Sequence, residues 1–305
     1  MFEGRKRAPS LFISKWVGKN ENALRRLLFS LALLRHRRRF EPYMSSFWHT
    51  LRGLWEKSPV FLLRTPNDKQ ESLCRVSPTN LLALFFLWER GYPAFAGVEE
   101  GRRFRWEIAP QRYFITRGDF PWEVSSFYEV FVEGCYRVDR QIERVIDIGA
   151  FNGDTVAYFA LQGAEVLALE PDPFHAEMGI ENVKLASLEE QVCWVIGAWS
   201  VKRQRLLFSP PPPPYRASFE VEGYPLEDLL QTKGWSSVCL AKVSCEGCEK
   251  KIILQLSHET LRRAEMWMIR QESYAPSVRE KLQEAGFAVE ERPVQGATLL
   301  IAQRR

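Results

Sequence analysis

The chain has 305 residues, of which 46% are hydrophobic and 26% charged, so it is long enough and apolar enough to bury a core of its own. Its longest apolar runs, at 27–34 and 81–88, are shorter than the roughly 20 residues that cross a bilayer, so we expect no membrane span. The N-terminus lacks a secretory signal pattern and the six cysteines form no disulfide framework, so we expect a cytoplasmic protein with reduced thiols.

The first 40 residues are strongly basic. They hold 11 Lys and Arg against two Glu, a net charge of +9 in a chain whose total is only +4. Such an arm can hold an anionic partner such as nucleic acid or a lipid surface. Its leucines also recur at helical spacing, so it can instead be a solvated helix that docks a leucine stripe on the body, and we favour this second interpretation.

The region from 11 to 95 is predicted to be mainly helical, with Thr79 or Asn80 as the N-cap of the helix that follows. Alternating apolar and polar residues at 102–117 predict a two-stranded β-ribbon, and 209–215 is a stiff polyproline segment. We therefore divide the chain into a helical basic region (1–95), a β-ribbon with a lead-in segment (96–140) and an α/β domain (141–305).

From 144 onward, short apolar strands alternate with segments of helical length, which is typical of an α/β protein with a doubly wound parallel sheet. The last two strands follow each other without a helix, so they are expected to form an antiparallel hairpin. The expected strands lie near 144–148, 165–169, 191–197, 238–243, 265–271, 286–291 and 297–302, and the helices near 153–162, 173–179, 225–232, 247–256 and 275–285.

A glycine loop, "RVIDIGAFNGDT", follows the first of these strands. Gly149 lets the backbone turn sharply toward a ligand, and Gly153 allows close packing where the next helix begins. The pattern differs from the G-x-G-x-x-G of dinucleotide folds, because Asp147 and Asp154 flank it. These carboxylates would repel a pyrophosphate but attract a sulfonium and an amino group. The loop therefore favours S-adenosyl-L-methionine over NAD.

The next strand ends in "VLALEPDP", which places Glu170 at its carboxyl end, about 20 residues after the loop. An acidic side chain in this place can accept hydrogen bonds from both hydroxyls of a ribose. The loop and this carboxylate come in the order that a nucleoside-containing cofactor requires.

These motifs, with "FYEVFVEGCYR", "YPLEDLL", "KVSCEGCEKKI", "MIRQES" and "LQEAGF", resemble those of the FkbM-type S-adenosylmethionine-dependent methyltransferases over 120–290. The resemblance implies a Rossmann-like methyltransferase sheet of seven strands, with the S-adenosylmethionine-binding domain at 141–305. The cofactor residues that it implies are Asp147, Gly149, Gly153 and Asp154 at the methionine part and Glu170 at the ribose, with Ala150, Asn152 and Pro171 of the same motifs beside them.

The segment "AKVSCEGCEK" (241–250) carries two cysteines within a motif of this family, which usually reads Lys-x-Asp-x-Glu-Gly-x-Glu. Ser244 stands where the family has Asp. Cys245 and Cys248 occupy the variable positions, so we expect a buried, inert pair. A zinc site needs four ligands and C-x-x-C supplies two, so no metal is expected. A redox role stays open, because a thiol at a helix N-terminus has a lowered pKa.

Methyl transfer to a hydroxyl needs an aligned acceptor and benefits from a base. The residues that we expect to carry catalysis are Glu246 and Glu272 as bases, Lys242 beside the carboxylate and Ser244 at the strand end. His175 is a further candidate base, although a histidine in this position is more often a surface or capping residue.

Three functions are compatible with the sequence. The one we favour is an O-methyltransferase that acts on a hydroxyl of a sugar, a lipid or another small metabolite. The second is a nucleic-acid methyltransferase that uses the basic arm, whose binding would depend strongly on salt. The third is a degenerate methyltransferase fold that binds a ligand or partner without catalysis, which Ser244 suggests.

Overall fold

The computed structural model describes residues 34–35, 38, 60–64, 71–91, 94–120, 122–210, 217–245, 247–294 and 296–304. Most of the basic arm, the polyproline residues 211–214 and Glu246 lie outside these ranges, so the expectations for them stay predictions. Among the described residues, no helix combines the length and the apolar character that a membrane span requires.

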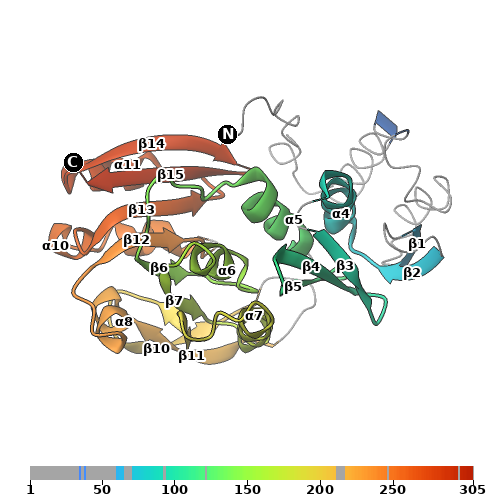
Figure 1. Ribbon diagram of the computed structural model, residues 1–305. Coiled ribbons are helices and arrows are strands. Elements are labelled where there is room, and N and C mark those ends of the chain that lie inside the picture. Colours follow the sequence, from blue (N-terminus) through green and yellow to red (C-terminus); the bar gives the residue numbers. More distant parts are fainter. Residues whose placement is uncertain are drawn as a thin grey trace.

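A seven-stranded sheet with the order β14-β15-β13-β12-β6-β7-β8 forms the centre of the fold (Figure 1). Its strands are parallel except β15, which pairs antiparallel with both of its neighbours. The predicted doubly wound, Rossmann-like sheet with its terminal hairpin is therefore confirmed. The strands are β6 (Arg144–Ile148), β7 (Glu165–Glu170), β8 (Val192–Ile196), β12 (Val238–Val243), β13 (Ala264–Gln271), β14 (Phe287–Val294) and β15 (Ala297–Arg304).

Both faces of the inner strands of this sheet are buried, because successive residues of these strands belong to two different apolar clusters. Val145 lies in the cluster with α6 and α7, whereas Ile146 lies in the cluster with α8, α9 and α11. This is why the strands read as continuous apolar runs. The helices are α6 (Asp154–Ala160), α7 (Pro173–Leu185), α8 (Leu226–Thr232), α9 (Cys248–Ile253), α10 (His258–Leu261) and α11 (Pro276–Glu284).

Helix α7 is longer than the predicted 173–179, because Gly179 does not end it. A Cβ at Gly179 would lie 2.2 Å from Cη2 of Trp194, so the glycine makes room for an indole that packs on the helix. A packing requirement therefore explains a residue that the sequence alone indicates as a helix breaker.

A second, three-stranded sheet precedes the central one and contains β3 (Ala94–Glu99), β4 (Arg103–Ala109) and β5 (Arg112–Arg117). The sequence predicted only the last two strands. β3 escapes prediction because the pairing register shifts between Phe95 and Gly97, which interrupts the alternation. Before it come the antiparallel pair β1 (Val60–Arg64) and β2 (Glu71–Arg75) and the expected helix α4 (Pro78–Arg90). The pair lies in the region 11–95, which was predicted to be mainly helical, so that prediction was wrong for these two segments.

The N-cap of α4 is Ser77, so the predicted cap at Thr79 or Asn80 was wrong. Asn80 is fully buried and its side-chain amide donates to the carbonyls of Gly118 and Phe120, at 3.0 and 2.6 Å. Asn80, which resembled a cap in the sequence, therefore connects α4 to the segment after β5 by hydrogen bonds.

The three-stranded sheet shares one apolar core with the central sheet. Trp106, Phe114 and Phe127 belong to the same buried cluster as Val145 and Val166. Between the two sheets lie α5 (Glu123–Tyr128) and the π-helical turn η2 (Glu129–Glu133), and α5 is seen there in Figure 1. The described part of the N-terminal half is thus packed into the body of the protein.

A third sheet, with the order β10-β11-β9, follows β8 in the chain and was not predicted. It contains β9 (Ala198–Trp199), β10 (Gln204–Phe208) and β11 (Phe219–Tyr224). None of the residues of β10 is buried, so no buried apolar run marks it.

Asn182 of α7 connects β5 to the glycine loop. Its Oδ1 accepts the N–H of Ile115 at 2.7 Å, and its Nδ2 donates to the carbonyls of Ile115 and Asn152, at 3.1 and 3.0 Å. Asn182 is fully buried. One side chain of α7 therefore connects β5 to the glycine loop in a place that water does not reach.

We expect Asn182→Leu to lower the free energy of unfolding by at least about 2 kcal/mol, because a buried backbone group without a partner costs about 1–3 kcal/mol. Urea denaturation measures this change. Lys184→Ala, an exposed change on the same helix, is the control and should have almost no effect. Equal stability of the two variants would show that the contacts of Asn182 do not hold the sheets together.

Candidate functional site

A buried ion pair lies at the carboxyl ends of β6 and β12. Asp147 and Lys242 are paired in the register of these parallel strands, and Nζ of Lys242 lies 2.7 Å from Oδ1 of Asp147. The same ammonium donates to the carbonyl of Gly149 at 2.7 Å, and the hydroxyl of Thr155 donates to Oδ2 of Asp147. The pair fixes both ends of the glycine loop. Among the described residues, Lys242 thus contacts Asp147 and this loop, and its expected role beside a catalytic carboxylate stays a prediction because Glu246 lies outside those residues.

Gly149 has φ +77°, and a Cβ there would lie 2.0 Å from the carbonyl oxygen of Ser244. The N–H of Ser244 donates to the carbonyl of Ile148 at 2.9 Å. The loop and the end of β12 are therefore in direct backbone contact. No side chain fits at 149 without moving one of them, which explains the glycine.

Asp154 begins α6 and is buried, while its partner Ser126 is half-buried. Its carboxylate accepts hydrogen bonds from the hydroxyl of Ser126 and from the N–H of Thr155, and burial raises its pKa. Asp147 is already matched by Lys242, so Asp154 is the loop carboxylate whose charge is not matched by an ion pair among the described residues.

Asn152, at the centre of the loop, is fully buried. Neither its side-chain oxygen nor its side-chain nitrogen has a hydrogen-bond partner among the described residues. A buried amide without partners is costly, so this side chain is suited to a polar group of a bound ligand.

Glu170 ends β7 and meets the glycine loop. Its two carboxylate oxygens accept the N–H groups of Phe151, at 2.9 Å, and Asp172, at 3.0 Å. Burial nevertheless raises its pKa to about 7. Pro171 follows directly and is half-buried, while Ala150 is fully buried in the loop.

His175 is buried, so its expected place on the surface was wrong. Its Nδ1 lies 3.7 Å from Oδ2 of Asp172 and 3.9 Å from Oε1 of Glu170. The imidazole packs edge-on against the rings of Phe120 and Phe151.

A second polar cluster surrounds Arg270 of β13. The guanidinium lies 3.8 Å from a carboxylate oxygen of Glu129 and also 3.8 Å from one of Glu272, and the Glu272 side chain is 59% exposed. Burial raises the pKa of Glu129 to about 7. Sequence reasoning missed Glu129, although a carboxylate inside the apolar run "FYEVFVEG" was a usable signal.

Cys245 and Cys248 form a disulfide, so the expectation of two reduced, inert thiols was wrong. Sγ of both residues and a carboxylate oxygen of Glu249 lie within 4.8 Å of one another. Ser244, which contacts Gly149 of the glycine loop, directly precedes Cys245. Glu246 lies between the two cysteines in the sequence and is outside the described residues. The bridge joins the end of β12 to the first turn of α9.

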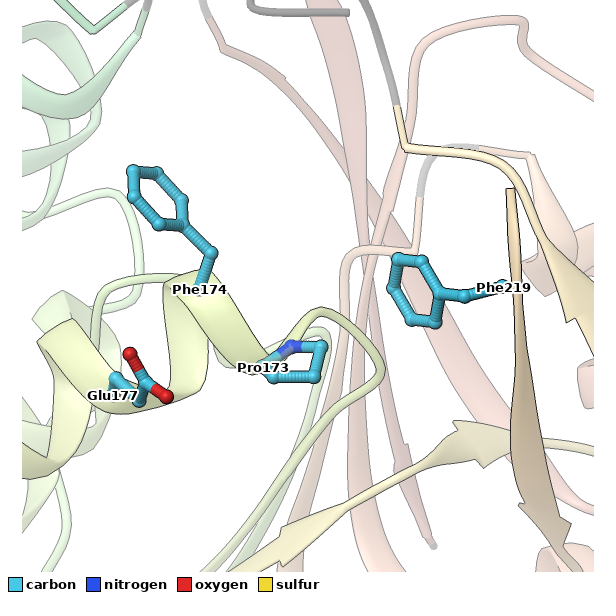
Figure 2. Close-up of a pocket in the computed structure, with 4 residues that line it drawn as sticks. All are labelled: Pro173, Phe174, Glu177 and Phe219. Carbon is cyan, nitrogen blue, oxygen red and sulfur yellow. The ribbon is translucent and has the colours of Figure 1, made fainter. Parts of the chain in front are cut away.

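A cavity of about 290 Å³ opens beside this site, between the first turn of α7 and β11. It is lined by Pro173, Phe174, Glu177 and Phe219, and Figure 2 shows Phe219 across from Pro173 and Phe174. Cζ of Arg117 lies 4.0 Å from the ring centre of Phe174. The walls are apolar and aromatic, with one carboxylate at the rim, and they begin three residues after Glu170.

No protein-family model matches the sequence, and no curated protein matches it. Solved structures with a similar fold include the METTL16 MTase domain, with 17% identity over 81% of this chain and 87% of that one and a TM-score of 0.46. An S-adenosylmethionine-dependent methyltransferase from Agrobacterium tumefaciens has 14% identity over 69% of this chain and 76% of that one, with a TM-score of 0.42.

An O-methyltransferase family protein from Burkholderia thailandensis has 14% identity over 54% of this chain, with a TM-score of 0.35, and the match covers about half (51%) of its length. All three TM-scores are below 0.5, so nothing about the substrate or the mechanism of this chain follows from these likenesses.

The raised pKa of Glu170 predicts a stability change with pH. Its pKa is about 7 in the folded protein against 4.5 ordinarily, so between these values the folded protein holds a proton that the unfolded chain has released. The contribution of this group is full below pH 4.5 and is lost as the pH rises through 7. The free energy of unfolding therefore falls by on the order of 3 kcal/mol over this pH range because of Glu170, and a variant without this carboxyl should not show the fall.

We therefore expect Glu170→Gln to gain stability relative to the wild type between pH 5 and pH 8, measured as the free energy of unfolding in urea. Glu177→Gln, an exposed change on the neighbouring helix, serves as the control and should follow the wild type. Parallel pH profiles for the wild type and Glu170→Gln would contradict a raised pKa at Glu170.

Proposed function

We propose that this chain is an S-adenosylmethionine-dependent methyltransferase of the FkbM type, which methylates a hydroxyl of a sugar, a lipid or another small metabolite. The observation that carries the proposal is the meeting of the glycine loop with Glu170, whose carboxylate accepts the N–H of Phe151 at 2.9 Å. It lies where the strand order reverses, since β6 has β7 on one side and β12 on the other. Doubly wound sheets bind ligands at such a switch point.

The residues of the loop suit the parts of this cofactor. Glu170 can accept the ribose hydroxyls, the unpartnered amide of Asn152 can bind a polar group, and Asp154 can attract the positively charged amino end. When bound, S-adenosylmethionine supplies a methyl group on a positively charged sulfur. Asp147 serves a positional role, because Lys242 already neutralises it. These assignments fit the buried, polar character of the site.

The acceptor hydroxyl needs a base, and Glu129 is the best candidate among the described residues. Its pKa of about 7 lets it take a proton near neutral pH, and Arg270 at 3.8 Å holds its charged form. Glu272, which is mostly exposed, is a second candidate, and Glu246 stays a proposal from the sequence. With Glu129 present, Ser244 in place of the family's Asp does not leave the site without a carboxylate.

An apolar part of a bound ligand fits the cavity between α7 and β11. Phe174 and Phe219 offer apolar ring faces, and the carboxylate of Glu177 can accept hydrogen bonds from hydroxyl groups at the rim. Such walls favour a small molecule that has both an apolar face and hydroxyls. The alternative of a nucleic-acid acceptor depends on the basic arm, most of which lies outside the described residues.

Titration calorimetry with S-adenosylmethionine and S-adenosylhomocysteine tests the proposal. We expect both to bind, and we expect Glu170→Ala to weaken binding by about tenfold to a hundredfold, since hydrogen bonds to a charged group contribute about 1.5–3 kcal/mol. Asn152→Ala and Asp147→Ala should also weaken it, the latter by releasing the loop.

Glu177→Ala is the matched control, because this exposed carboxylate lies outside the cofactor residues. Circular dichroism verifies that each variant is folded, and Glu170→Gln replaces Glu170→Ala if the smaller residue unfolds the protein. A folded wild type that binds neither compound would exclude the methyltransferase function.

A further inference from the structure

We infer that Cys245 and Cys248 form a redox site, a reversible dithiol–disulfide pair whose oxidation state sets the affinity of the glycine-loop site for its cofactor. The inference rests on the proposed function and deepens it. The starting observation is the disulfide itself, with a Cα–Cα distance of 5.5 Å between two cysteines that have no part in the proposed function.

The pair is accessible in a way that two other cysteines are not. Cys245 and Cys248 are half-buried, whereas Cys74 and Cys135 are buried and burial raises the pKa of both thiols, that of Cys74 to about 11. A reductant can therefore reach the disulfide without unfolding the core. Reactive cysteines are typically partly exposed in this way.

The disulfide is one residue away from the glycine loop. Ser244 directly precedes Cys245, and its carbonyl oxygen occupies the space where a side chain of Gly149 would lie, 2.0 Å from the Cβ position. Its N–H donates to the carbonyl of Ile148 at 2.9 Å. Any change in the backbone of the turn after β12 is therefore transmitted to the loop through direct contact.

The bridge constrains this turn covalently. It joins Cys245, two residues after the end of β12, to the first residue of α9, and the N–H of Cys248 donates to the carbonyl of Cys245 at the long distance of 3.5 Å. A disulfide reduces the number of conformations open to the segment that it closes. In the oxidised protein, Ser244 is thus kept against Gly149.

Reduction also changes the hydrogen bonding of a buried carboxylate. Oε2 of Glu249 accepts the N–H of Gly247 at 2.9 Å and lies 3.4 Å from Sγ of Cys245. A reduced Cys245 gains an S–H that can donate to this oxygen and compete with Gly247. The turn then loses its covalent constraint and has a second way to satisfy Glu249.

The chemistry is thiol–disulfide exchange with a dithiol reductant. A thiolate of the reductant attacks one protein sulfur and forms a mixed disulfide, while the electron pair of the broken bond stays on the other protein sulfur, which takes a proton. The second thiol of the reductant then releases the remaining protein sulfur, which is also protonated. The protein gains two electrons and two protons, and the reductant leaves as a disulfide.

The first experiment counts thiols and measures affinity on the full chain, with and without dithiothreitol. Without reductant, alkylation in denaturant followed by mass spectrometry should label four cysteines (Cys74, Cys135, Cys193 and Cys239), and after reduction all six. We expect the oxidised protein to bind S-adenosylhomocysteine about fivefold or more tightly than the reduced protein, the range of ordinary coupling between sites.

Variants separate this effect from a general effect of reductant. A Cys245→Ser, Cys248→Ser double variant should bind as weakly as the reduced wild type and should not respond to dithiothreitol. Cys239→Ser, a half-buried free cysteine on the same strand β12, is the matched control and should respond as the wild type does. If the double variant does not fold, the comparison of the oxidised and reduced wild type still decides.

Each other outcome overturns the inference. Six labelled cysteines without reductant would exclude the disulfide, and equal affinities in the two states would exclude the coupling while leaving the methyltransferase function intact. Tight zinc binding by the reduced protein would assign Cys245, Cys248 and Glu249 to a metal site instead. If neither the oxidised nor the reduced protein binds S-adenosylhomocysteine, the proposed function is overturned and this inference with it.

Discussion

The buried ion pair between Lys242 and Asp147 is the interaction on which the candidate site depends. Both side chains are almost completely buried, and each also holds the glycine loop, Lys242 through the carbonyl of Gly149 and Asp147 through Thr155. A buried pair adds little net stability compared with apolar residues, but breaking it leaves an uncompensated charge. Because a shift of one residue turns a side chain to the other face of the sheet, the pair also favours one register of β12 against β6.

The central sheet could be predicted from the sequence because its strands are buried on both faces and therefore appear as short apolar runs. The elements that were missed have weaker patterns for identifiable reasons. β3 is interrupted at Gly97, and β10 has no buried residue. Helix α7 continues past Gly179 only because Trp194 needs the space. Such features depend on packing between distant segments, which no local pattern encodes.

The same distinction applies to the site. Asp147, Gly149 and Glu170 belong to short motifs with a fixed spacing, so a single sequence was enough to bring them together. The contact of Lys242 with Gly149 spans 93 residues, and the position of Glu129 beside Arg270 spans most of the α/β domain. The sequence identified Lys242 but did not predict its pairing with Asp147. Glu129 was missed because it lies in a helical turn whose packing against Arg270 of β13 the local sequence does not encode.

The single core that joins the three-stranded sheet to the central sheet bears on how this protein could have diversified. Trp106, Phe114 and Phe127 fill the space beside the central sheet, and Asn182 ties β5 to the glycine loop. Exchange of this region for that of another protein would remove part of the support of the loop. Recombination would therefore be constrained here, because an exchanged module would have to keep both these apolar contacts and the hydrogen bonds of Asn182.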